Sequence, residues 1–248
     1  MIPKKIHYCW FGRGEKPKLA KKCIASWKKY CPDYEIIEWN EDNFDINMNE
    51  YTKMCYEQKK YAFLSDYVRL LVVYQNGGLY FDTDVELVRN PDFLLENEAF
   101  FGFETEGISK PKNEILNTGL AFGSVASGLA FGSVASGLAL EKMIEEYTPL
   151  LDGKSGTIGC PILNTQAMIK LGLKPGGEIQ RLSYATVYPK EYFNPYESTT
   201  GVLNKTRNTV SIHWYAGSWL TPIQQIKSKI TKPLHRIFGT ECFGKFRK

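Results

Sequence analysis

This sequence of 248 residues has neither a closely spaced cysteine pair nor the features expected of a leader segment. The chain opens MIPKKIHYCWFG, which has neither the apolar stretch nor the small-residue cleavage site of a signal peptide. Its cysteines are scattered, without a CxxC pair or the spacing typical of a zinc site. We therefore expect reduced thiols in a cytoplasmic protein. The cysteines are Cys9, Cys23, Cys31, Cys55, Cys160 and Cys242.

We also predict no transmembrane helix, although an uncharged run extends from Ile115 to Leu140. The run is long because GLAFGSVAS occurs twice in tandem, at 119–127 and 128–136. Its many Gly and Ser residues are atypical of a spanning helix, which needs about 20 mainly apolar residues. We interpret the repeat as a recent and functionally neutral duplication that lengthens a loop or an edge. Because the copies are identical, the sequence does not tell which of them keeps the original register.

Basic residues are concentrated at the two ends of the chain, whose formal net charge is +4. Residues 1–31 carry nine Lys or Arg and one Glu, and residues 227–248 carry seven and one. The middle of the chain is therefore acidic, which argues against a nucleic-acid partner. The tail, 226–248, has apolar residues between basic ones, typical of an amphipathic helix on an anionic membrane. That interpretation predicts peripheral contact through 227–248 with the inner face of the cell membrane. The alternative is a solvated lysine-rich surface.

Strand-like and helix-like segments alternate along the chain, which predicts an α/β fold. We expect a Rossmann-like mixed sheet flanked by helices in a single domain, residues 1–225, followed by the basic tail. The predicted strands are Lys5–Trp10, Tyr34–Trp39, Leu79–Phe81, Leu116–Phe122 and VSIHW at 210–214. The predicted helices are Lys18–Tyr30, Tyr56–Gln75, Asn164–Leu171 and a helix capped by Ser136 that runs through Met143 and Tyr147.

Two carboxylates follow the apolar strand in GGLYFDTDVE, residues 77–86. In an extended segment, Asp82 and Asp84 point the same way, so they repel each other unless a cation lies between them. Oxygen ligands favour Mg²⁺ or Mn²⁺, and the open positions of such an ion suit phosphate oxygens. Ligands of open α/β sheets bind beyond the carboxyl ends of strands, where this pair falls. The alternative for the pair alone is a solvated acidic turn.

The helix before this strand carries a second polar group, in the segment AFLSDYVRLLVVYQNGG. Asp66 and Arg69 are spaced i, i+3 and share a helix face, and Ser65 is one turn before Arg69. Arg presents a fixed fork suited to phosphate, and Asp accepts hydrogen bonds from sugar hydroxyls. The alternative is an intrahelical salt bridge. The carboxylate pair one strand later favours the binding interpretation.

The string SDYVRLLVVYQNGGLYFDTDVE resembles the nucleotide-sugar signature of DXD-containing glycosyltransferases of the capsular-polysaccharide and initiating-mannosyltransferase type. IPKKIHYCWFG, SWKKYCPDYEIIEWNE and HWYAGSW resemble further segments of that family. The catalytic domains of large clostridial glucosylating toxins are more distantly similar. The resemblance implies a GT-A type fold. It also implies sugar transfer from a UDP- or GDP-sugar to a glycan acceptor, with Mn²⁺ or Mg²⁺ and retention, in the synthesis of bacterial cell-surface polysaccharide.

Roles for individual residues follow from the same resemblance. Asp66, Arg69, Asp82 and Asp84 are the implied catalytic residues, and Asp82, Asp84 and His213 the implied metal ligands. Trp10 would stack on the base, Tyr80 would line the nucleotide, and Ser218 and Trp219 would close over the phosphate. The full implied substrate-binding set is Cys9, Trp10, Tyr61, Ser65, Asp66, Arg69, Tyr80, Asp82, Thr83, Asn117, Ser218 and Trp219. For Trp10 and His213, ordinary core positions are the alternative. Cys160-Pro161 is interpreted as a turn, and a loop there that meets the acceptor is the alternative.

Two other functions remain open at the level of sequence. A phosphotransferase or phosphatase of the haloacid-dehalogenase type also uses DxD after a strand, but Val85 and Glu86 follow here, where Thr is normal. A membrane-associated protein that binds a nucleotide sugar without transfer is the non-enzymatic alternative. Turnover of a donor separates this binder from an enzyme, and phosphatase activity without a nucleotide sugar would support the phosphatase. The tail makes a lipid-linked glycan the preferred acceptor.

Overall fold

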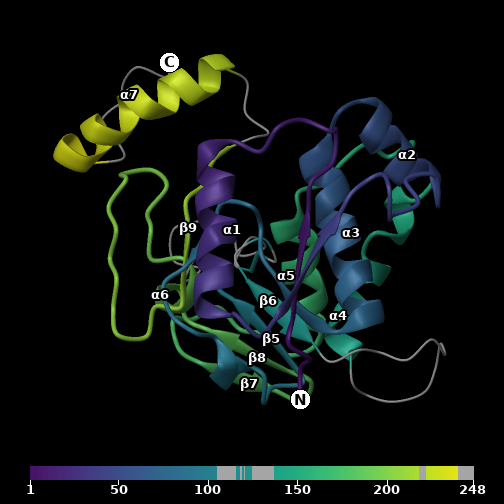
Figure 1. Cartoon of the computed structure of the whole chain (residues 1–248), viewed down its shortest axis with the longest axis horizontal. Coiled ribbons are helices and arrows are strands. Elements are labelled where there is room, and N and C mark those ends of the chain that lie inside the picture. Colours follow the sequence, from purple (N-terminus) through teal and green to yellow (C-terminus); the bar gives the residue numbers. More distant parts are fainter. Residues whose placement is uncertain (105–115, 118, 120, 125–136, 218–221, 240–248) are drawn as a thin grey trace.

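The structure is a computed structural model that describes residues 1–104, 116–117, 119, 121–124, 137–217 and 222–239. The strands are short, because turn residues interrupt the apolar segments, and most of them are joined by helices (Figure 1). The strands of these ranges are β1 (Lys5–Cys9), β2 (Glu35–Trp39), β3 (Gly78–Tyr80), β4 (Val85–Leu87), β5 (Ala99–Gly102), β6 (Phe122–Ser124), β7 (Gln180–Leu182), β8 (Ala185–Tyr188) and β9 (Ser211–His213).

A seven-stranded mixed sheet occupies the centre, in the order β2-β1-β3-β6-β5-β8-β7. β2, β1 and β3 run parallel, whereas β6 is antiparallel to both of its neighbours, β3 and β5. β8 is parallel to β5 and antiparallel to β7. β4 and β9 form a separate antiparallel pair. This pair continues the chain from β3 and brings the carboxyl end of β9 beside the turn that follows β3.

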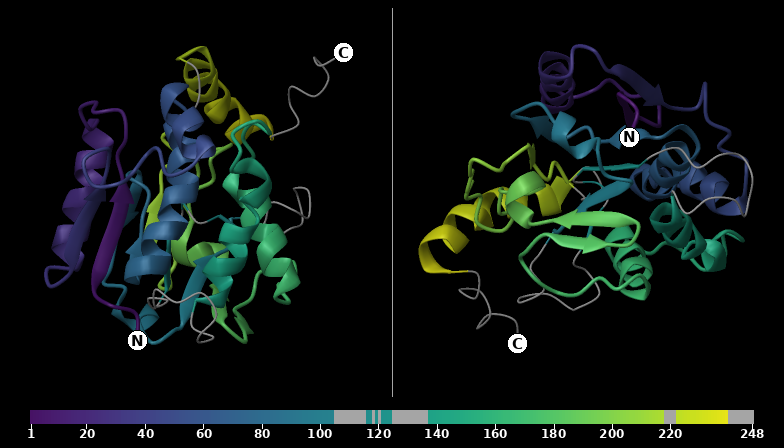
Figure 2. Two further views of the ribbon diagram at one scale, coloured as in Figure 1. Left: turned by 90° about the vertical axis from the view of Figure 1, so that its right-hand side faces the viewer. Right: turned by 90° about the horizontal axis from the view of Figure 1, so that it is seen from below.

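Helices cover both faces of the sheet (Figure 2). α2 (Glu50–Glu57), α3 (Tyr61–Asn76), α4 (Leu138–Glu145) and α5 (Cys160–Lys170) share one apolar cluster, which includes Tyr80 and Phe101 of the sheet. α1 (Lys18–Tyr30) packs on the other face, where buried Trp27 contacts Phe81. Leu79 lies in that second cluster, next in sequence to Tyr80 in the first. Such alternation is expected of a strand that is buried on both faces.

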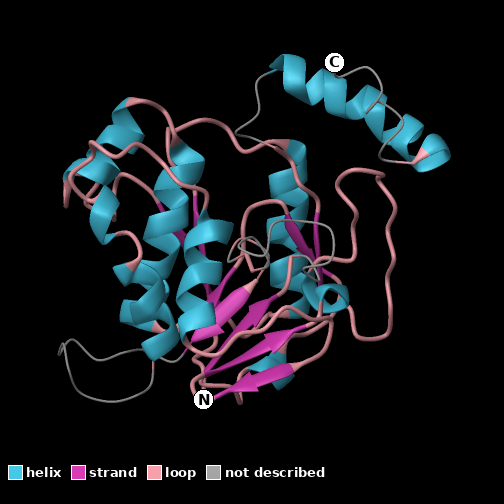
Figure 3. Ribbon diagram, turned by 180° about the vertical axis from the view of Figure 1, so that it is seen from behind, coloured by secondary structure: helices cyan, strands magenta, loops and turns pink. Residues whose placement is uncertain are grey.

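Among the residues described, the remaining helical elements are the C-terminal helix α7 (Pro222–Phe238) and three short ones. α7 lies outside the layers of sheet and helices (Figure 3) and contacts the body through Lys232 and Tyr196. It begins four residues before the predicted tail. Within the described ranges, none of the helices combines the length and the apolar character needed to cross a bilayer. The short elements are α6 (Lys190–Phe193) and the 3₁₀ turns η1 (Asp92–Leu94) and η2 (Thr148–Leu150).

The prediction of one helix over Tyr56–Gln75 is wrong, because the chain forms α2 and α3 with a break between them. Lys59 has a φ of 55°, and the Lys60 N–H donates to the Cys55 carbonyl at 2.7 Å. A left-handed residue followed by such a bond is the Schellman ending of a helix. Lys59 adopts this conformation without the glycine that usually signals it, so no residue type predicted the break.

The predictions around the tandem repeat are also partly wrong. The strand is Phe122–Ser124 instead of Leu116–Phe122, and Leu116 forms only an isolated bridge with Phe103. α4 starts after Gly137 and ends before Tyr147, and Ser136 lies outside the described residues. α5 begins at Cys160, four residues earlier than predicted, because Pro161 is well tolerated in a first helical turn. The residues of β6 belong to the first copy; residues 125–136 are not described.

Candidate active site

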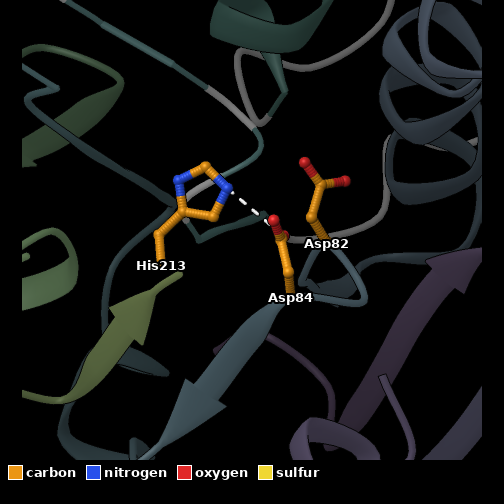
Figure 4. Close-up of side chains that lie close together, drawn as sticks. All are labelled: Asp82, Asp84 and His213. Carbon is orange, nitrogen blue, oxygen red and sulfur yellow. Dashed lines mark ion pairs between the residues drawn. The ribbon is translucent and has the colours of Figure 1, made fainter. Parts of the chain in front are cut away.

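Asp82 and Asp84 lie in the turn between β3 and β4, beyond the carboxyl end of β3. β9 ends at His213, whose register partner across the β4–β9 pair is Val85. This pairing places the imidazole beside Asp84 (Figure 4). Asp82, Asp84 and His213 each offer a ligand atom within 4.8 Å of the others. The predicted metal-ligand set is therefore gathered in space, although 129 residues of sequence separate its last two members.

Asp84 hydrogen-bonds to the residues that follow β9 and so holds them beside the DXD turn. Its Oδ1 lies 3.2 Å from His213 Nε2, and its Oδ2 accepts a hydrogen bond from the Ala216 N–H at 2.7 Å. The Asp84 carbonyl also accepts from the Trp214 N–H at 3.0 Å. Burial raises the pKa of Asp84, but the His213 imidazole and the Ala216 N–H outweigh it, so the pKa lies below its usual value. The Asp84 carboxylate is thus ionised at neutral pH.

His213 is buried, and its Nδ1 has no hydrogen-bond partner among the described residues. Burial lowers its pKa, but Asp84 and then Asp82 outweigh burial and raise the pKa above its usual value. The imidazole therefore responds to an excess of negative charge at this point. A divalent cation relieves the same excess, and two carboxylates with an imidazole suit an ion such as Mn²⁺. The residues present fit a bound metal.

Arg69 is buried in α3 and is held by two carboxylates. Its Nη2 lies 2.6 Å from Asp66 Oδ1 and 3.3 Å from Asp82 Oδ1, and its Nε donates to the Ser65 carbonyl at 3.1 Å. The predicted intrahelical salt bridge with Asp66 is therefore present, and the guanidinium also reaches the DXD turn. In this arrangement Arg69 positions Asp66 and Asp82 as well as supplying positive charge.

Asp66 lies where α3, α5 and the segment 116–119 converge. Burial raises its pKa, while Arg69 and hydrogen bonds from the backbone and thiol of Cys160 lower it, with a net rise. Asn117 Oδ1 accepts from the Gly119 N–H at 2.7 Å and from the Cys160 thiol at 3.4 Å. Gly119 packs so closely that a Cβ there would lie 2.3 Å from Asp82 Oδ2. The predicted sugar-binding residues Asp66 and Asn117 thus border one region, with Cys160 between them.

The residues predicted to hold the nucleotide lie at the end of β1. Trp10 is half-buried, and its indole N–H donates to the Gly14 carbonyl at 2.7 Å. The Tyr61 ring covers Gly12, where a Cβ would lie 2.4 Å from it. Tyr80 is buried, and its hydroxyl donates to Asp82 Oδ1 at 3.1 Å. Cys9 is buried beneath this layer, and burial raises the pKa of its thiol to about 12, although the charge of Arg69 and then hydrogen bonds with Tyr80 and Ser65 oppose the rise.

Sequence reasoning missed two groups of this site. Cys160 is a partner of Asp66 and Asn117, although we interpreted it as part of a turn. Glu104 is a buried acid after β5, and its Oε1 accepts from the Tyr215 hydroxyl at 3.2 Å. The Tyr215 ring packs against the His213 ring in a tilted arrangement, with ring centroids 4.1 Å apart. An acid after the apolar run AFFGF was the available signal for Glu104, since Asp82 follows a similar run.

The predicted residues differ in how far the structure places them. Thr83 lies half-buried between the two aspartates. Ser218 and Trp219 lie outside the described residues. Four acidic side chains, from Asp66, Asp82, Asp84 and Glu104, meet one buried arginine and one histidine. The excess of negative charge is consistent with a site that accepts a cation.

Residues 17–101 match the family of glycosyltransferase sugar-binding regions that contain a DXD motif. The matched residues include Asp66, Arg69 and the DXD turn, and the resemblance stated from the sequence is thereby confirmed.

Known proteins resemble this chain over different shares of its length. Inositol phosphoceramide mannosyltransferase 3 of Schizosaccharomyces pombe is 28% identical over 106 residues, which is 40% of this chain and 29% of the relative. The PaToxG glycosyltransferase structure covers 68% of this chain and 69% of its own, with 19% identity and a TM-score of 0.51. A glycosyltransferase involved in the glycosylation of the major capsid of PBCV-1 covers 93% and 100%, with 8% identity and a TM-score of 0.49. The fold is of the GT-A type.

Proposed function

We propose that this protein is a metal-dependent glycosyltransferase that moves a sugar from a nucleotide diphosphate to a glycan acceptor. One observation carries the proposal: Asp82 and Asp84, within the region that matches the family, and His213 offer ligand atoms within 4.8 Å of one another. A cation-binding group at the carboxyl end of β3 lies where ligands of open α/β sheets bind. The family match covers residues 17–101, whereas the proposed activity is that of the whole chain.

Mn²⁺ is the proposed ion, held by Asp82, Asp84 and His213. Mg²⁺ is a weaker candidate, because an imidazole nitrogen is a poor ligand for an ion that prefers oxygen. When bound, the ion supplies positive charge where the leaving diphosphate becomes more negative. The protein keeps this set in place through the Asp84 hydrogen bonds to the chain after β9.

We propose different tasks for the two sides of the site. Trp10 and Tyr61, at the end of β1 and the start of α3, are the proposed stacking surface for the base. Asp66 and Asn117 are proposed to accept or donate hydrogen bonds to sugar hydroxyls. Arg69 positions Asp66 and Asp82 through contacts of 2.6 and 3.3 Å. Holding both substrates in one geometry supplies much of the rate enhancement expected of such a site.

We propose retention at the anomeric carbon. The bond from that carbon to the β-phosphate oxygen breaks, and a bond to the acceptor oxygen forms on the same face. The acceptor proton moves to the departing phosphate oxygen, so no separate protein base is required. The released nucleoside diphosphate keeps the electron pair of the broken bond and carries the proton taken from the acceptor.

A lipid-linked glycan on the inner face of the cell membrane is the proposed acceptor, in the synthesis of capsular or other surface polysaccharide. The support comes from α7, whose sequence PIQQIKSKITKPLHRIF contains no acidic residue. Ile223, Ile237 and Phe238 are 79%, 71% and 68% exposed on it. Apolar and basic side chains on one helix favour an anionic bilayer.

Sedimentation with vesicles tests this surface. We expect binding to vesicles that contain phosphatidylserine, weak binding to pure phosphatidylcholine, and loss of binding in Ile237→Ser/Phe238→Ser. Ile169→Ser, which removes an exposed isoleucine from α5, is the matched control. Equal binding of all variants to both kinds of vesicle would contradict a role of α7.

Donor hydrolysis tests the activity. A panel of UDP- and GDP-sugars is incubated with the wild type in Mn²⁺ or a chelator, and nucleotide release is measured. We expect release of one nucleotide with Mn²⁺, its loss with the chelator, and its loss in Asp84→Asn. Asp152→Asn, at an exposed acid, is the matched control. Metal-dependent binding without turnover in the presence of candidate acceptors would support a non-catalytic binder, and no binding of any donor would refute the proposal.

A further inference from the structure

The segment 214–217, which follows β9, contains a tyrosine in an unusual backbone conformation. Tyr215 has a φ of 49°, in the left-handed region that residues with a side chain seldom adopt. Besides glycines, the described residues with a positive φ are Arg13, Lys59 and Tyr215, and the first two have exposed side chains. Tyr215 instead is half-buried beside His213. Such a conformation costs free energy and persists where surrounding contacts hold it, often at functional sites.

Buried polar groups from two distant parts of the chain hold the Tyr215 side chain. Its hydroxyl accepts a hydrogen bond from Asn194 Nδ2 at 2.6 Å and donates to Glu104 Oε1 at 3.2 Å. Asn194 Nδ2 also donates to the Glu104 carbonyl at 3.3 Å. Asn194 follows α6, Glu104 follows β5, and both residues are buried. A phenol hydroxyl that both donates and accepts inside the protein has a fixed orientation.

The anchored tyrosine lies between two residues whose backbone N–H groups bind Asp84. The Trp214 N–H donates to the Asp84 carbonyl at 3.0 Å, and the Ala216 N–H donates to Asp84 Oδ2 at 2.7 Å. In an extended strand, such alternate N–H groups lie roughly 7 Å apart and reach different residues of the partner strand. The left-handed backbone of Tyr215 turns the chain, so that both groups reach a single aspartate.

The Tyr215 ring also packs against the imidazole of His213. The two ring planes are tilted by 43°, and their centroids are 4.1 Å apart. His213 Nε2 lies 3.2 Å from Asp84 Oδ1, and the imidazole turns this nitrogen toward the carboxylate (Figure 4). Groups that support a ligating side chain fix its direction and strengthen metal binding. Tyr215 therefore contacts one candidate ligand through its ring and restrains another through the backbone that follows it.

We propose that Tyr215 is a positioning residue that Glu104 and Asn194 anchor. Through its ring and its backbone, it holds the imidazole of His213 and the carboxylate of Asp84 in one arrangement before a divalent cation binds. A strained residue held by buried contacts is typical of a site that is shaped before its ligand arrives. The effect on the cation rests on the proposed function, whereas the restraint on the chain after β9 does not depend on it.

The affinity for Mn²⁺ alone, measured without a nucleotide sugar by electron paramagnetic resonance of the free ion, tests the effect on the cation. Tyr215→Phe removes only the hydroxyl and should weaken binding by about 10–100-fold, the range typical when the hydrogen-bonded support of a metal ligand is lost. Tyr196→Phe is the matched control and should bind like the wild type. The Tyr196 ring packs against Trp214 in the same segment, but its hydroxyl faces Lys232 of α7. Equal affinity in all three proteins, or an equal loss in both variants, would overturn the proposal.

Substitutions of Glu104 separate anchoring from a direct effect of its charge on the cation. Burial lowers the pKa of His213, whereas nearby acids, Glu104 among them, raise it, so a direct effect is the alternative. Glutamine keeps an oxygen that accepts from the Tyr215 hydroxyl, and leucine does not. Glu104→Gln should therefore bind Mn²⁺ within about two-fold of the wild type. Glu104→Leu should lose as much as Tyr215→Phe, without a further loss in the double variant. An equal loss in Glu104→Gln and Glu104→Leu would overturn the anchoring role.

Hydrogen exchange in the metal-free protein, followed by NMR, tests the restraint on the chain independently of the proposed function. The amides of Trp214 and Ala216 should be protected in the wild type and in Tyr196→Phe, and should exchange about ten-fold faster in Tyr215→Phe. Unchanged exchange in Tyr215→Phe would refute the restraint. If the wild type binds no Mn²⁺ but the exchange differs as expected, the proposed function fails and the restraint stands. If Tyr215→Phe does not fold, Glu104→Leu takes its place in both measurements.

Discussion

Acidification should destabilise this protein through His7, which is buried in β1. His7 Nε2 lies 2.8 Å from the Gly77 carbonyl, and the Trp39 indole N–H donates to His7 Nδ1 at 3.0 Å. These two contacts select the neutral ring with its proton on Nε2. Burial is the main reason why the pKa of His7 falls to about 4, although the Gly77 carbonyl opposes it.

The magnitude follows from the difference between the folded and unfolded pKa values. His7 takes up its proton near pH 6.5 in the unfolded chain and near pH 4 in the folded one. The contribution to stability is therefore complete above pH 6.5 and is lost progressively as the pH falls from 6.5 to about 4. At about 1.4 kcal/mol per pKa unit, the full loss is roughly 3 kcal/mol, and most of it has occurred by about pH 4.5.

Urea unfolding at pH 8 and pH 4.5 measures this loss in the wild type and in His7→Gln. The wild type should lose roughly 2 to 3 kcal/mol more than the variant between the two pH values, because glutamine does not titrate. If His7→Gln does not fold, the ring signals of His7 in the wild type are followed by NMR against pH. Equal losses in the two proteins, or a ring that titrates near pH 6.5, would refute the reasoning.

Three further changes test other parts of the structure. Arg69→Met should lower the free energy of unfolding by about 3–5 kcal/mol, because it leaves Asp66 and Asp82 without their buried partner; the deficit should shrink at low pH as they protonate, and an unchanged urea midpoint would contradict this. Trp10→Ala should weaken nucleotide binding by about 1–3 kcal/mol if the indole stacks on the base, as isothermal titration would show, whereas unaltered affinity would place Trp10 in the core. Asn49→Ala should destabilise by about 1 kcal/mol in thermal unfolding, because Asn49 Oδ1 caps α2 by accepting from the Thr52 N–H at 2.9 Å, and a stable variant would show that the cap is dispensable.

The sequence predicted local elements best where one physical signal was enough. α1 has the predicted bounds, Lys18–Tyr30, because its apolar residues recur at helical spacing. Gly77 ends α3, as predicted, with a φ of 63° that suits glycine. The break at Lys59 was missed because a lysine adopts the left-handed conformation there, and no residue type marked the turn.

Within the candidate site, the sequence predicts the positions of the two aspartates of the DXD turn better than those of the residues around them. Asp82 and Asp84 are two residues apart after a strand, so their common direction follows from the geometry of an extended chain. His213, Glu104 and Cys160 come from distant parts of the chain, and only pairing and packing bring them near. Glu104 had one local signal, its place after the apolar run AFFGF, whereas Cys160 carried no local pattern that separates a site residue from an ordinary buried one.

The sequence by itself determined the α/β class, the helix and strand near the DXD turn, and the existence of two identical nine-residue copies. These depend on the periods of apolar residues, on glycine at a helix end and on sequence identity, which are all local properties. Only the tertiary structure decided that Asp84 holds the chain after β9, that Arg69 joins two carboxylates, and that the first copy occupies β6. Each of these depends on which distant segments meet in the sheet, and burial then gives the charges at that place their shifted pKa values.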